Sequence, residues 1–174
     1  MRVGETVKFS VWKKAIVTVT GIVVVGFLMG IVSTAASQRQ VGRPRQAELP
    51  APGWALRVVW TTLYTMMGIA LEVVLNAAPS AERSRGLTLF GAQLLLNFAW
   101  SPIFFGAHLI GLALIVILLT NALVTAAIVN FWRVRPLAWA LLLPYLARLC
   151  LATALNYETG HLNPLANSHP LGLT

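Results

Sequence analysis

Polar and aromatic side chains recur at helical spacing in three apolar stretches of the chain. The first set comprises Arg57, Trp60, Thr61, Tyr64 and Gly68. The second comprises Gln93, Asn97, Trp100 and Phe104, and the third comprises Tyr145, Arg148, Ala152 and Asn156. Residues at these spacings share one face of a helix. Because polar groups in hydrocarbon are costly and face the bundle interior, we expect one internal ligand site with aromatic walls and a few hydrogen-bonding groups.

Arg148 is the most informative of these residues, because it lies near the middle of its apolar stretch. An arginine there costs roughly 2.5–3.5 kcal/mol on insertion scales, so it needs an acidic partner, backbone carbonyls or water. Our hypothesis is that Arg148 and Arg57 give the internal site a preference for anionic carboxylates. Two alternatives stay open: Arg148 pairs with Glu72, the only acid within the apolar stretches, or it contacts lipid headgroups.

The other residues each have a purely structural interpretation as well. Gln93 and Asn97 can form interhelical hydrogen bonds with no ligand involved. Trp60 and Trp100 can be ordinary core packing, and Cys150 is typical of a small buried hydrophobe. The grouping of several such residues on three faces is therefore what favours a ligand site.

Several kinds of catalytic and metal chemistry find no support in the sequence. Aspartate is absent and only five glutamates occur, which argues against a hydrolytic triad. No cluster of histidine, cysteine and glutamate has metal-ligand spacing, so no metal site is expected. The single cysteine cannot form an internal disulfide. We expect no required cofactor.

The composition places these residues in a membrane protein. Hydrophobic residues make up 57% of the 174 residues and charged residues 10%, whereas soluble domains carry about 25% charged residues. A spanning helix needs about 20 apolar residues, and five stretches qualify: 15–36, 53–77, 87–107, 109–131 and 136–157. We expect an all-α membrane protein, a five-transmembrane-helix bundle, with a basic head at residues 1–14 and a polar tail at 158–174.

The net charge is +8, and the basic residues lie mostly beside the ends of these apolar stretches. This placement indicates membrane orientation rather than nucleic-acid binding. Eight lysines and arginines fall on the face of the N-terminus and three on the other face, so the N-terminus is predicted inside. The host membrane is not indicated. The first stretch has a rival interpretation as a cleaved signal peptide. The connection at 37–52 is either a linker or a lid, and Gly26-x-x-x-Gly30 is a ridge for helix packing or dimerisation.

Three motifs in order resemble the TspO/MBR family, which comprises the translocator proteins, or peripheral benzodiazepine receptors, and the tryptophan-rich sensory proteins. They are WTTLYTMMG at residues 60–68, QLLLNFAWSPIFFG at 93–106, and PYLA at 144–147 followed by ALNY at 154–157. The resemblance covers residues 52–157. It implies a five-helix bundle, often a homodimer, that binds porphyrins, sterol-like lipids and benzodiazepine-type drugs. It also implies that the pocket is lined by Trp60, Gln93, Asn97, Ala152 and Leu155.

The chain departs from this family at the position of Arg148, where members commonly carry tryptophan. That tryptophan is linked in some bacterial members to light-dependent porphyrin breakdown. We therefore expect a binding protein for tetrapyrroles, and for sterol-like lipids, in transport or stress signalling. A porphyrin-degrading enzyme and a ligand-free structural or regulatory subunit are the alternatives. The expected partners are the lipid bilayer, a porphyrin or sterol-like molecule, and a second copy of the chain.

Overall fold

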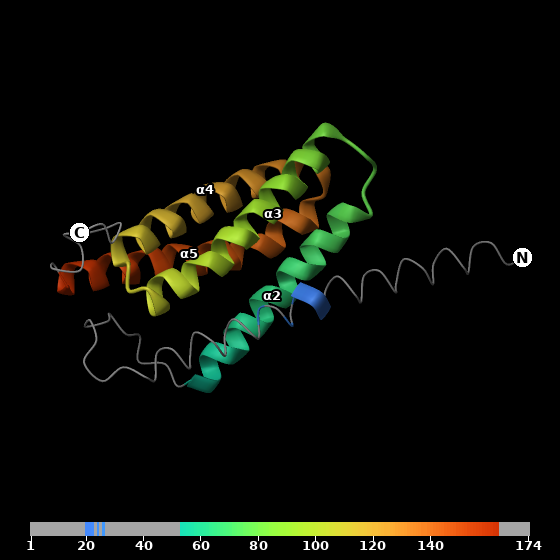
Figure 1. The fold of residues 1–174 in the computed structure, drawn as a ribbon. Helices are drawn as coiled ribbons and strands as arrows, with labels where there is room; N and C mark the ends of the chain where they lie inside the picture. Colours follow the sequence, from blue (N-terminus) through green and yellow to red (C-terminus); the bar gives the residue numbers. More distant parts are fainter. Residues whose placement is uncertain (1–19, 23, 25, 27–52, 164–174) are drawn as a thin grey trace, which may run out of the picture.

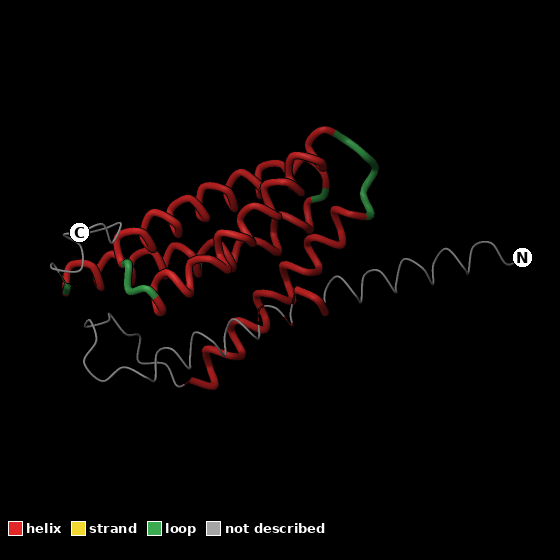
Figure 2. Tube along the Cα trace, viewed as in Figure 1, coloured by secondary structure: helices red, strands yellow, loops and turns green. Residues whose placement is uncertain are grey.

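A computed structural model describes residues 20–22, 24, 26 and 53–163, with only the backbone described for residues 53–57. These residues form helices and no strand (Figures 1 and 2). The elements are α2 (Gly53–Leu75), α3 (Ala81–Ser101), the π-helix η1 (Pro102–Gly106), α4 (Ile110–Val134) and α5 (Pro136–Leu162). Residues 20–22, 24 and 26 are also helical. The connection at 37–52 and nearly all of the stretch at 15–36 lie outside the described residues.

The described helices have the length and composition of membrane spans. Four of them, counting η1 as the continuation of α3, contain apolar segments long enough to cross a bilayer. Their outward-facing side chains are apolar, as shown by Leu95, which is 71% exposed, and Trp132, which is 65% exposed. So much apolar exposure indicates a membrane environment. The chain is therefore an all-α integral membrane protein.

The helix α4 packs along both α3 and α5. The helix α2 packs chiefly on α5 and touches α3 less. Figure 1 shows α2 diverging from the other three helices toward its N-terminal end. The connections α2–α3 and α4–α5 lie at one end of the bundle, and the α3–α4 connection and the end of α5 lie at the other.

The helix α3 begins at Ala81, ahead of the expected start at residue 87. Ser80 caps it, because its side chain accepts a hydrogen bond from the backbone N–H of Arg83. Arg83 in turn donates to the carbonyls of Val74 and Leu75, at 3.0 and 2.8 Å, and so satisfies the end of α2. Arg83 and Arg85 therefore lie in the first turns of a helix rather than in a connection.

The stretch without charged residues folds into an antiparallel hairpin at a π-turn. Ala107 donates its backbone N–H to the carbonyl of Pro102, five residues earlier, at 2.9 Å. His108 follows with a φ of 57°, which is unusual for a residue other than glycine. The helix α4 then begins at Ile110.

The helix α5 ends beyond the expected boundary at residue 157. Thr159 and Gly160 are buried, and the backbone N–H of Asn163 donates to the carbonyl of Gly160 at 3.3 Å. The last turn of α5 thus packs on the bundle, and residues 158–162 are helical instead of belonging to the polar tail. Residues 164–174 lie outside the described part of the chain.

Candidate functional site

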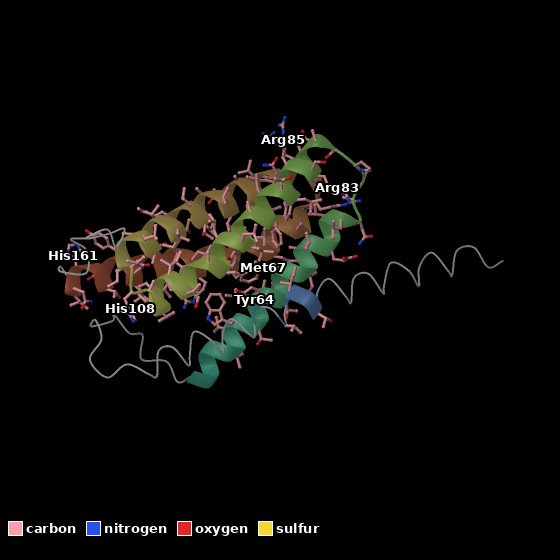
Figure 3. The ribbon with its side chains drawn as sticks, viewed as in Figure 1. Tyr64, Met67, Arg83, Arg85, His108 and His161 are labelled. Atoms are coloured by element: carbon pink, nitrogen blue, oxygen red, sulfur yellow. The ribbon has the colours of Figure 1, made fainter. Side chains whose placement is uncertain are left out.

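Tyr64 and Asn97 join α2 to α3 inside the bundle. Tyr64 is 3% exposed, and Figure 3 places it with Met67 on the side of α2 that faces the other helices. The side-chain amide of Asn97 donates to the Tyr64 hydroxyl at 2.8 Å. The hydroxyl therefore has a partner in the low-dielectric interior, where an unpaired polar group is costly.

Tyr145 and Gln93 join α5 to α3 in the same way. The Tyr145 hydroxyl donates to Oε1 of Gln93 at 2.9 Å, and both side chains are 1% exposed. Nε2 of Gln93, by contrast, is buried and has no hydrogen-bond partner among the described residues. The amide thus has an accepting half that is satisfied and a donating half that is not.

Arg148 joins α5 to α2 through an aromatic face. Its guanidinium carbon lies 5.3 Å from the centre of the Trp60 ring, within the range of a cation–π contact. Trp60 is itself stacked on Tyr64, with 5.7 Å between ring centres. Nη1 of Arg148 is buried and has no hydrogen-bond partner in the described part of the chain.

Together these contacts form a continuous ring of side chains that links α2, α3 and α5. We call the set the polar-aromatic cluster; its members are Trp60 and Tyr64 on α2, Gln93 and Asn97 on α3, and Tyr145 and Arg148 on α5. Each neighbouring pair either makes a contact given above or lies one helical turn apart on one helix. These six members of the three helical faces identified in the sequence therefore meet, whereas Thr61, which the sequence predicts on the same face as Tyr64, is exposed.

A second group extends the cluster toward the π-turn. The indole N–H of Trp100 donates to Oδ1 of Asn156 at 3.1 Å, and the amide of Asn156 donates to the carbonyl of Ile110, also at 3.1 Å. Trp100 stacks on Phe104 at 4.9 Å between ring centres. Both polar atoms of Asn156 are engaged in helix–helix bonds, so a predicted contact with a ligand would have to share or replace these bonds.

The remaining predicted site residues lie around these groups. Ala152 packs against the core, and Leu155 is partly buried on the next turn. The side chain of Arg57 lies outside the described residues. Sequence reasoning missed the part played by Gly26: a Cβ there would overlap the Tyr64 ring. Its small-residue spacing indicated close packing but not the partner.

One open alternative is not observed, and one expectation about an individual residue is wrong. No ion pair links Arg148 to Glu72 among the described residues; Glu72 instead accepts a hydrogen bond from the side chain of Asn76, one turn later on the same helix end. Cys150 is exposed rather than buried, because it lies on the outer side of α5. Its thiol donates to Oδ1 of Asn121 on α4, at 3.5 Å.

The fold and the cluster define a class: an integral membrane protein of apolar helices whose few polar and aromatic side chains meet in the interior. Comparison with known proteins makes the assignment more specific. The family model described as the TspO/MBR family matches residues 18–162, and the chain belongs to this family. The resemblance seen in the three motifs is thereby confirmed.

Individual relatives agree with this assignment. The chain is 43% identical to the translocator protein of Sus scrofa over 108 residues, which cover 61% of this chain and 64% of that protein. It is 44% identical to the translocator protein of Homo sapiens, with the same coverage. It is 34% identical to the tryptophan-rich sensory protein of Cereibacter sphaeroides over 112 residues, 64% of this chain and 69% of that protein. The chain thus spans less than two thirds of the two mammalian relatives.

Proposed function

We propose that this protein binds tetrapyrroles, and sterol-like lipids as a second ligand class, inside the membrane and acts in transport or stress signalling. The observation that carries the proposal is the polar-aromatic cluster itself. Trp60 and Tyr64 offer stacked rings to a flat apolar ligand. Gln93 and Arg148 offer donors that are buried and unpartnered. Ligand sites of this kind combine aromatic walls with a few placed polar groups.

We propose a five-helix bundle as the architecture that holds the ligand. The stretch at residues 15–36 supplies the fifth span, and its described residues support this because Ile22 packs against the core and Gly26 lies against the Tyr64 ring. A homodimer is proposed on the family resemblance. The N-terminus is proposed to face the inside of the host membrane, on the charge distribution.

A titration of purified protein with protoporphyrin IX, followed by quenching of tryptophan fluorescence, tests the binding proposal. We expect saturable quenching for the unchanged protein. Asn97→Leu removes the amide that donates to the Tyr64 hydroxyl. Trp60→Phe replaces the indole beneath Arg148 with a smaller ring that attracts a cation less strongly. Each should raise Kd about fivefold or more, which corresponds to roughly 1 kcal/mol. Trp132→Phe is the matched control, because Trp132 is exposed and outside the cluster.

Other outcomes separate the rival functions. Absence of saturable quenching in the unchanged protein would overturn the proposal and favour a structural or regulatory subunit without a ligand. Illumination of the complex, with the porphyrin absorption band followed over time, tests the enzyme alternative. Loss of the band that depends on the protein would indicate porphyrin degradation rather than binding alone.

A further inference from the structure

Two buried hydrogen-bond donors in the polar-aromatic cluster have no acceptor. They are Nη1 of Arg148 and Nε2 of Gln93, and neither has a partner among the residues that the structure describes. Gln93 is 1% exposed. Nearly all buried polar groups in proteins are hydrogen-bonded, so an unsatisfied pair points to a missing acceptor.

The two donors belong to the same interior region. Gln93 accepts from Tyr145, and Arg148 lies one helical turn beyond Tyr145 on α5. Arg148 also covers Trp60, whose stacked neighbour Tyr64 accepts from Asn97, one turn beyond Gln93 on α3. An acceptor beside Tyr145, between α3 and α5, would lie next to Gln93 and one helical turn from Arg148.

The chemistry of the donors specifies the acceptor. A guanidinium that lies on an aromatic face keeps its in-plane N–H groups available, and their geometry matches a carboxylate. Among the described residues no acid bonds to its Nη1, and Glu72 accepts from Asn76 instead. Gln93 can add a neutral N–H to the second carboxylate oxygen. The apolar surroundings favour an acid carried by a hydrophobic body.

We propose that Arg148 and Gln93 together recognise the carboxylate of a hydrophobic ligand, so that the site selects free acids over their esters. This inference rests on the proposed function and adds the chemical group of the ligand that the site recognises. The carboxylate could be carried by a tetrapyrrole or by a fatty acid, and the test distinguishes these two sources.

The test compares protoporphyrin IX with its dimethyl ester, which has the same ring and no negative charge. The unchanged protein should bind the acid about 10- to 100-fold more tightly, as expected for hydrogen bonds to a charged group. Arg148→Met should remove this preference by weakening acid binding while ester binding stays the same. Gln93→Leu should reduce the preference in part. Arg85→Met is the control, because Arg85 is exposed at the end of the bundle (Figure 3).

The possible results separate the carboxylate inference from the proposed binding function. Equal binding of acid and ester by the unchanged protein, or an unchanged preference in Arg148→Met, would overturn the inference and leave the proposed function standing. Binding of neither compound would instead overturn the proposed function. Oleate is the probe for the fatty-acid source. If oleate displaces protoporphyrin from the unchanged protein but not from Arg148→Met, the site recognises a carboxylate and accepts it from a fatty acid. If Arg148→Met does not give a monodisperse helical protein, Gln93→Leu decides by the same ratio.

Discussion

At the scale of single residues, the polar groups inside this bundle are used in pairs. Tyr64 with Asn97, Tyr145 with Gln93, and Trp100 with Asn156 each bridge two helices. Such bonds form where water is excluded, so loss of one partner leaves the other unsatisfied. The same residues that shape the site therefore also stabilise the fold, and binding measurements need a stability control.

Asn156→Ala provides a test at this scale. Asn156 is 1% exposed and bonds to both Trp100 and the carbonyl of Ile110, so its truncation removes two hydrogen bonds between helices. We expect the free energy of unfolding to fall by about 1–3 kcal/mol, measured by titration with dodecyl sulfate. Asn130→Ala is the matched control, since its amide bonds only to the carbonyl of Ala126 in its own helix. Equal losses in the two variants would contradict the bridging role.

At the scale of elements, a glycine allows the first apolar stretch to approach α2. Gly26 is buried, and a Cβ at this position would overlap the Tyr64 ring. Small residues permit such close helix–helix contact in membranes. Tyr64 thus has its ring against Gly26 and its hydroxyl bonded to the amide of Asn97, so the position of its side chain depends on both neighbours.

Replacement of Gly26 by valine should displace the Tyr64 ring, because the added side chain would occupy the same space. We expect overpacking to lower the free energy of unfolding by about 1–3 kcal/mol and to weaken protoporphyrin binding as the Tyr64–Asn97 bond is strained. Gly21→Val is the matched control in the same apolar stretch, because nothing lies within 4 Å of a Cβ at Gly21. Unfolding titrations and the quenching assay measure the two effects. Normal stability and affinity in Gly26→Val would show that the contact does not position the ring.

At the scale of the whole molecule, charge is distributed unequally between the two ends. Figure 3 shows Arg83 and Arg85 at one end and His108 and His161 at the other. Arg135 lies between α4 and α5. It belongs to the same end as Arg83 and Arg85, because α2 and α4 both have their C-terminal ends there. Positively charged residues are retained on the inner side of a membrane, so the charge distribution predicts this end to face inside.

Cysteine labelling tests this orientation. In a Cys150→Ser background, His161→Cys should react with a membrane-impermeant maleimide added to intact cells or organelles, whereas Arg135→Cys should react only after the membrane is opened. Both positions lie at the ends of α5 and are exposed. Labelling of both variants in opened membranes confirms that each cysteine is reactive. The reverse pattern in intact membranes would mean that the protein has the opposite topology.

Much of this organisation follows from the sequence. Apolar stretches long enough to span a bilayer leave helices as the only solution, because every backbone group must be bonded within its own segment. The spacing of polar residues then determines which side of each helix turns inward. For this reason the sequence predicts that Tyr64, Asn97, Tyr145 and Arg148 meet in one region. The helix ends were less predictable, since Ser80 and Asn163 act through local hydrogen bonds that hydropathy does not report.

By itself, the sequence determined the helical membrane class, the family and the inward faces, because these depend on local periodicity and residue type. Only the tertiary structure decided which groups become partners. Arg148 could have paired with Glu72 on sequence grounds, but helix packing places it over Trp60 and leaves one of its nitrogens without an acceptor. Such pairings depend on the rotation and depth of one helix against another, which no single helix encodes.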